Sequence, residues 1–181
     1  MAKVTQPTPV PALESHLFPD DGLIPNHPTL PLICYRGAFA GLPEGEEPPF
    51  EHYFKQSGWE GTWRWGVYGF HHYHSNAHEV LGVVRGSATI RFGGATGKSC
   101  LVSPGDMVVI PAGVGHRNEG SSAGFCVVGA YPSGQNPDLC RDTPEEYRRA
   151  AGNIASVPLP ASDPLYGEAG PLMGLWQNSE Q

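Results

Sequence analysis

Short β-prone runs separated by turn residues dominate the middle of this sequence, and their recurrence constrains the fold more than any other feature. Between Trp59 and Tyr131, runs rich in valine, isoleucine and aromatic residues alternate with glycine and proline about every ten residues. The whole chain holds 24 glycines and 19 prolines in 181 residues, a composition that suits many turns and few long helices. An all-β sandwich or barrel is predicted, rather than alternating strands and helices. The predicted strands are 32–39, 62–74, 79–85, 88–92, 100–102, 107–110 and 125–131.

Helices are predicted at only two places. Residues 50–56 suit a short helix or helical turn. Residues 143–146 read Thr-Pro-Glu-Glu, in which threonine can cap a helix, proline suits its first position and the second glutamate can reach back to the cap. This pattern predicts a helix from Pro144 to about Asn153.

The two ends of the chain differ from the β-rich centre. Residues 1–31 are rich in proline, which removes backbone donors and favours extended geometry in the preceding residue. We therefore expect one domain with three parts: an extended N-terminal arm (1–31), a β-barrel (32–135) and a C-terminal segment (136–181) that carries the short helix and wraps the surface.

Charge and hydropathy narrow the classes of partner. The formal net charge is −7, with 11 lysines and arginines and no basic run, so neither nucleic acid nor an anionic membrane is an expected partner. The sequence has no membrane-spanning apolar stretch and no secretion signal near its start, which predicts a cytoplasmic protein with a small-molecule ligand. In a reducing compartment the four scattered cysteines are expected to be free thiols in or near the core. They are Cys34, Cys100, Cys126 and Cys140.

A cluster of histidines marks the candidate functional site. On a strand, His72 and His74 project from the same face, and Glu79 at the start of the next strand adds a carboxylate. His116 is the only histidine later in the chain and is the natural fourth donor from across a barrel. Three imidazoles and one carboxylate suit a divalent transition ion (Fe, Mn, Ni, Co or Zn) better than Ca or Mg. His78, beside Glu79, is an alternative ligand or a supporting residue around the metal, whereas His71 is expected to face away.

Two spaced motifs carry a family resemblance. Gly66, five residues, His72-Tyr73-His74, four residues, Glu79, six residues and Gly86 resemble the first cupin motif at every specified position. Gly105, five residues, Pro-Ala-Gly at 111–113, two residues and His116 resemble the second motif. That motif normally ends in asparagine, with three residues between it and the histidine.

At that last position this chain has Gly120, and the nearest asparagine is Asn118. The loop after His116 is therefore expected to differ from the family pattern. Over residues 18–170 the chain further resembles the uncharacterised YjlB-like bacterial cupins. The resemblance implies a double-stranded β-helix, or jelly-roll barrel, with metal ligands His72, His74, Glu79 and His116, and it implies a homodimer.

The expected function is a metal-dependent enzyme acting on a small organic molecule. Four protein ligands leave up to two positions on an octahedral ion, so an oxygenase is the first expectation, with an isomerase as another reaction known among cupins. The alternative is a non-catalytic module that binds a small ligand or a sugar. If the strand through His72 and His74 is regular, Arg64, Tyr68 and Phe70 face the lumen, so Tyr68 and Arg64 are candidate catalytic residues. Trp63 and Trp65 would then lie outside, available to a partner subunit.

Overall fold

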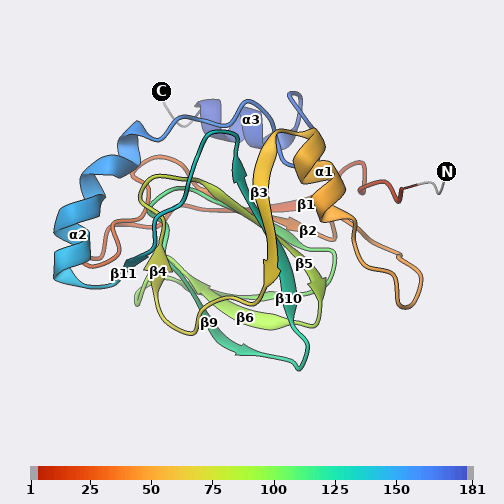
Figure 1. Ribbon diagram of the computed structural model, residues 1–181, viewed down its shortest axis with the longest axis horizontal. Coiled ribbons are helices and arrows are strands. Elements are labelled where there is room, and N and C mark those ends of the chain that lie inside the picture. Colours follow the sequence, from red (N-terminus) through yellow and green to blue (C-terminus); the bar gives the residue numbers. More distant parts are fainter. Residues whose placement is uncertain (1–3, 179–181) are drawn as a thin grey trace.

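The computed structural model describes residues 4–178, whose regular structure is mostly β-strand (Figure 1). The strands are β1 (Ala12–His16), β2 (Leu32–Arg36), β3 (Trp59–Trp65), β4 (His72–Tyr73), β5 (Glu79–Arg85), β6 (Ala88–Phe92), β7 (Lys98–Val102), β8 (Met107–Ile110), β9 (His116–Ser121), β10 (Cys126–Pro132) and β11 (Cys140–Arg141). The helices are α1 (Phe50–Gln56), α2 (Pro144–Ala150), the 3₁₀ helix η1 (Ala151–Ser156) and α3 (Pro171–Gln177).

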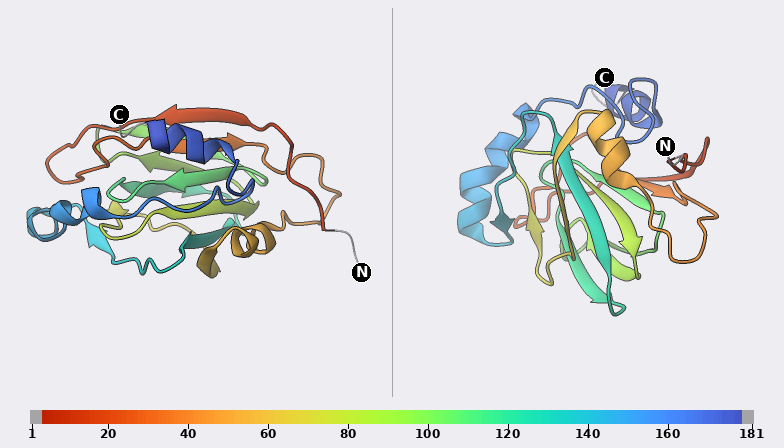
Figure 2. Two further views of the ribbon diagram at one scale, coloured as in Figure 1. Left: turned by 90° about the horizontal axis from the view of Figure 1, so that it is seen from above. Right: turned by 45° about the vertical axis from the view of Figure 1, so that its right-hand side comes forward.

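The strands form two antiparallel sheets, which confirms the predicted all-β class. The six-stranded sheet has the order β1-β2-β8-β5-β10-β3, and the five-stranded sheet has the order β11-β4-β9-β6-β7. Strands that are neighbours in a sheet are mostly distant in sequence, as expected when one chain passes repeatedly between two facing sheets. Figure 2 shows β1, in red, along one edge of this arrangement.

Hydrophobic side chains fill two layers, one on each face of the six-stranded sheet. Between the sheets, Leu81 and Val127 pack with Ile90 and Phe92 from the opposite side. On the outer face, α1 and α3 cover the sheet and contribute side chains such as Trp176. Strand β5 is therefore buried on both faces from Glu79 to Val84, which explains its continuous apolar sequence.

Several predicted elements are confirmed. The strands at 79–85, 88–92 and 107–110 and the helix at 50–56 have the predicted bounds. The second helix begins at Pro144, and the Thr143 side chain accepts a hydrogen bond from the Glu146 N–H, 3.2 Å away. The four cysteines are free and buried, as predicted.

The ends of the chain are more structured than expected. The N-terminal arm contributes β1, which pairs with β2 from Ala12 opposite Arg36 to His16 opposite Leu32. The C-terminal segment forms α3, whose Leu172 and Trp176 are buried. Both ends therefore belong to the packed fold.

The predicted long strand at 62–74 is wrong. β3 ends at Trp65 in the six-stranded sheet, and β4 begins at His72 in the five-stranded sheet. The connecting residues pass from one sheet to the other, held by a hydrogen bond from the Asn118 N–H to the Tyr68 carbonyl oxygen at 2.9 Å. Because the chain leaves its first sheet here, side-chain alternation does not continue from β4 back into β3.

Within residues 4–178, every helix is too short or too polar to span a lipid bilayer.

Candidate metal centre

A cavity of about 280 Å³ lies between the two sheets and contains the predicted metal ligands. Its wall is formed by side chains from both sheets and from the loops at that end of the barrel. These residues are Trp63, Trp65, Gly66, Val67, Tyr68, His72, His74, Glu79, Leu81, His116, Tyr131, Pro137, Asp138 and Leu139.

Three of the predicted ligands converge on one point of the cavity. The Oε2 atom of Glu79 lies 3.3 Å from Nε2 of His74 and 3.2 Å from Nε2 of His116. Among the described residues, these three form the group whose candidate ligand atoms all lie within 4.8 Å of one another. Glu79 begins β5 of the six-stranded sheet and His116, 37 residues later, begins β9 of the five-stranded sheet, so the barrel fold itself brings the group together.

The fourth predicted ligand, His72, lies beside this group. Its ring centroid is 4.0 Å from that of His116 and 6.2 Å from that of His74. β4 positions it directly opposite His116 on β9. His72 thus lines the cavity but is outside the tightest group of ligand atoms.

Backbone carbonyl groups orient all three imidazoles. Nδ1 of His72 donates to the carbonyl oxygen of Phe70 at 3.0 Å, and Nδ1 of His116 donates to that of Val114 at 3.2 Å. Nδ1 of His74 donates to the carbonyl oxygen of Asp138. A carbonyl oxygen only accepts, so each Nδ1 carries the proton and each neutral ring keeps its lone pair on Nε2. This is the arrangement by which proteins orient histidines that bind metals.

The ionisable groups at this point shift one another's pKa values. Burial alone would raise the pKa of Glu79, but the neighbouring His74 and His116 outweigh it and hold the pKa below its usual range. Burial would lower the pKa of His74, and the Glu79 carboxylate more than offsets this, so the pKa is raised. For His72, burial and the adjacent His116 lower the pKa to about 2, which leaves its ring neutral.

The residues present fit a divalent transition ion. Glu79 is fully enclosed, and its Oε2 atom has no hydrogen-bond partner among the described residues. Leaving a carboxylate oxygen buried and unsatisfied is costly. Donor atoms that share one ion at about 2.0–2.2 Å lie about 3–3.5 Å apart, and the Oε2–Nε2 separations of 3.2 and 3.3 Å agree with that spacing.

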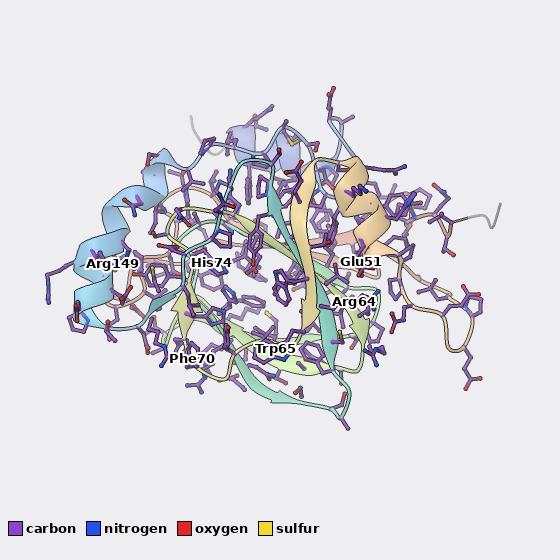
Figure 3. All side chains as sticks on the ribbon, viewed as in Figure 1. Glu51, Arg64, Trp65, Phe70, His74 and Arg149 are labelled. Atoms are coloured by element: carbon purple, nitrogen blue, oxygen red, sulfur yellow. The ribbon has the colours of Figure 1, made fainter. Side chains whose placement is uncertain are left out.

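The prediction that Arg64 faces the lumen is wrong, because its side chain lies outside the cavity. Its guanidinium binds both carboxylate oxygens of Glu51 on α1, at 2.5 and 2.8 Å, and Glu47 at 2.6 Å. Figure 3 shows Arg64 beside Glu51, on the opposite side of β3 from His74. The prediction assumed that side chains alternate between the two faces without interruption from β4 back into β3. The chain passes from one sheet to the other between these strands, so the alternation does not continue.

The two aromatic residues predicted to face the lumen both lie between β3 and β4, and only one of them lines the cavity. Tyr68 lines the cavity. Phe70 instead stacks on Tyr68, with ring centroids 4.8 Å apart, and lies under the guanidinium of Arg141 at 3.8 Å.

The alternative ligand His78 directly precedes β5 and lies outside the cavity. It is fully buried against Trp176, with ring centroids 4.8 Å apart, and its Nδ1 accepts a hydrogen bond from the Ala112 N–H at 2.9 Å. Neither His78 nor His71 is among the residues that line the cavity. His78 therefore has a structural position in the outer core, which corrects its assignment as an alternative ligand.

Sequence reasoning missed three residues of the site. Trp63 and Trp65, expected to face outward, line the cavity, and so does Tyr131 on β10. The Trp63 Nε1–H donates to the Tyr131 hydroxyl oxygen at 2.8 Å. Placing β3 and β4 in different sheets would have reversed the expected faces of both tryptophans. The homodimer stays a prediction.

Comparisons with known proteins agree with this geometry. The sequence profile of the family described as Cupin domain matches residues 66–128, a range that includes all four predicted ligands. The uncharacterized protein YjlB of Bacillus subtilis (strain 168) is 44% identical over 163 residues, which cover 90% of this chain and 96% of that relative.

Proposed function

This chain belongs to the cupin family, among its YjlB-like members, and from that premise we propose that it holds one divalent transition ion and acts on a small organic molecule. The proposed ligands are His74, Glu79 and His116, with His72 completing the set from its place beside His116. The observation that carries this proposal is the enclosed Glu79 oxygen, which faces two imidazole nitrogens and has no hydrogen-bond partner among the described residues.

The protein's own residues would supply orientation and enclosure. Carbonyl groups direct the three imidazoles inward, and the wall of the cavity limits access of water. A bound divalent ion would add Lewis-acid or redox chemistry at this point. An oxygenase is the reaction class that we propose first, and an isomerase is another that this donor set supports.

A non-catalytic ligand-binding module is the second candidate, and one observation favours it. Apart from the metal set, the ionisable side chains of the cavity wall are Tyr68, Tyr131 and Asp138. The Asp138 carboxylate is already occupied by the Ser75 N–H and hydroxyl groups, at 2.7 and 2.6 Å. The wall thus offers few groups for proton transfer, which many enzymes need and a binding module does not.

Elemental analysis of protein purified without a histidine tag tests the metal proposal. We expect about one transition ion per chain in wild-type protein and none in His74→Ala. In Glu79→Gln the affinity for the ion should fall more than about 100-fold, beyond the 10–100-fold typical of supporting residues. His52→Ala, which removes an exposed histidine on α1, is the matched control and should keep the ion. Wild-type protein that takes up none of Fe, Mn, Co, Ni or Zn would contradict the proposal.

Water exchange on the ion separates the two candidate functions. With Mn bound, an enzyme should show exchangeable water in relaxation measurements, because a reacting molecule needs an open position. A fully closed ion without exchangeable water would favour the binding module.

A further inference from the structure

The mouth of the cavity is framed by aromatic side chains that the proposed metal site does not use. Trp65 is 57% exposed and Tyr68 is 37% exposed, yet both line the cavity. Their ring centroids lie 5.0 Å apart in an edge-to-face contact, and Tyr68 makes a second such contact with His72 at 5.1 Å. An exposed pair of large apolar rings at the entrance to a cavity is typical of a ligand-binding surface.

Of this pair, Tyr68 is held in place from behind. Tyr68 stacks on Phe70, which in turn lies under the Arg141 guanidinium. The Tyr68 carbonyl oxygen also accepts a hydrogen bond from the Asn118 N–H of β9. Rings held in this way lose little conformational freedom when a flat molecule stacks on them.

The inner wall is mostly apolar, and its polar groups are largely occupied. Leu81, Val67 and Leu139 form apolar parts of the wall. The Trp63 N–H donates a hydrogen bond to the Tyr131 hydroxyl oxygen, and the Asp138 carboxylate accepts hydrogen bonds from Ser75. A polyol bound here would leave several hydroxyl groups unsatisfied, which is costly.

The absence of cationic side chains from the cavity wall argues against ligands that carry phosphate groups. None of the residues that line the cavity is a lysine or an arginine. Phosphate groups are normally bound by such cations or by helix N-termini. A nucleotide or sugar phosphate therefore has no recognisable partner in the wall.

Tyr131 is a polar group of the inner wall that could contact a ligand. Because its oxygen accepts the Trp63 N–H at 2.8 Å, its own O–H bond must point elsewhere. Its ring lies edge-on to His74, with centroids 5.9 Å apart, which places the tyrosine next to the proposed metal ligands. Burial and the nearby Glu79 carboxylate raise the pKa of this hydroxyl, so it keeps its proton and can donate it either to Glu79 or to an oxygen atom of a ligand at the metal end of the cavity.

Building on the proposed function, we propose that the cavity binds a neutral aromatic molecule of one or two rings that carries a hydroxyl or carbonyl oxygen. The ring stacks with Trp65 and Tyr68, and the oxygen lies toward Tyr131 and the metal ligands. The volume agrees, since an apolar cavity of about 150 Å³ holds benzene and this one measures about 280 Å³.

Calorimetric titration of zinc-loaded protein with phenol, cyclohexanol and glucose tests this inference. Zinc has no redox chemistry, so binding is measured without turnover. Phenol should bind at least about 5-fold more tightly than cyclohexanol, because only the aromatic ring gains stacking contacts, and glucose should not bind detectably. Equal affinity for phenol and cyclohexanol, or tighter binding of glucose, would overturn the inference.

Two variants locate the effect at the rim. Trp65→Ala and Tyr68→Leu should each weaken phenol binding about 3- to 10-fold and change cyclohexanol binding less. Leu101→Ala removes a 61% exposed apolar side chain outside the cavity wall and is the control that should leave both affinities unchanged. Unchanged phenol affinity in both rim variants would contradict the inference even if phenol binds.

Repeating the titration on chelator-treated protein separates this inference from the metal proposal. The preference for phenol over cyclohexanol should persist without the ion, because the stacking residues are not ligands. Protein that takes up no metal but keeps the preference would refute the metal site alone. Protein that binds metal without the preference would refute the aromatic ligand alone.

Discussion

At the residue scale, the hydrogen-bond partner of each imidazole determines what its other nitrogen can do. In His72, His74 and His116, Nδ1 donates to a carbonyl oxygen, so Nε2 is left with a lone pair. In His27 and His78, Nδ1 accepts backbone N–H groups, so the proton of the neutral ring is on Nε2. The first three therefore suit metal binding, and the other two are structural.

The buried His27 is predicted to make the stability of the protein depend on pH. Burial lowers its pKa from 6.5 to about 4, so the folded protein binds fewer protons than the unfolded chain between these values. Its contribution to stability is complete above about pH 6.5 and is lost as the pH falls toward 4. We expect this histidine to account for up to about 3 kcal/mol of the acid-induced loss of unfolding free energy, measured by urea denaturation of chelator-treated protein.

His27→Asn is the variant that isolates this effect. The asparagine side-chain oxygen can still accept the N–H groups of Thr29 and Leu30, but it does not titrate. The variant should lose less stability than wild type between pH 6.5 and 4, although His78, whose ring centroid is 6.3 Å away, still titrates. An identical slope in the two proteins would show that His27 is not responsible.

The sequence was sufficient to bring His72, His74, Glu79 and His116 to one cavity, because motif spacing encodes both the strand face and the strand opposite it. It was not sufficient for Arg64. The direction of that side chain depends on where the chain passes from one sheet to the other, and that point is set by long-range contacts such as the bond between Asn118 and Tyr68.

At the scale of elements, local signals predicted the strands and helices whose ends are marked by turn residues. Strands β5, β6 and β8 and helix α1 are of this kind. Helix α3 was missed because its sequence is short and its stability comes from packing on the barrel, with Leu172 and Trp176 buried.

Asp163 is predicted to hold this C-terminal region on the barrel. One carboxylate oxygen accepts from the Tyr35 hydroxyl of β2 at 2.5 Å and from the Leu172 N–H of α3 at 3.1 Å, and the other accepts from the N–H groups of Leu165 and Tyr166 at 2.9 and 3.1 Å. Asp163→Asn replaces one acceptor with a donor and should cost about 2–4 kcal/mol. Thermal unfolding should shift downward by about 5–15 °C.

Two further variants test this assignment. Tyr35→Phe removes one of the four donors and should cost about 1 kcal/mol. Glu168→Gln changes an exposed acidic residue in the same segment and should have little effect. If Asp163→Asn were as stable as Glu168→Gln, the carboxylate would not be what holds α3 in place.

At the scale of the whole molecule, the proposed metal ligands connect the two sheets. Glu79 is on β5 of the six-stranded sheet, whereas His72 and His116 are on β4 and β9 of the five-stranded sheet. The hydrophobic layers lie on both faces of the six-stranded sheet and do not depend on these residues. A bound ion would therefore add a cross-link to a fold that is already packed.

This arrangement predicts a folded metal-free protein that metal stabilises further. An ion present at about 1,000 times its dissociation constant adds about 4 kcal/mol, which raises the unfolding temperature by roughly 8–16 °C for a chain of this size. Glu79→Gln should fold and should lose most of this increase, because it removes the ligand contributed by the six-stranded sheet. Differential scanning calorimetry of chelated and zinc-loaded protein measures both. If the chelated protein were unfolded, the ion would be part of the core, and if zinc left the transition of wild-type protein unmoved, these four side chains would not form a metal site.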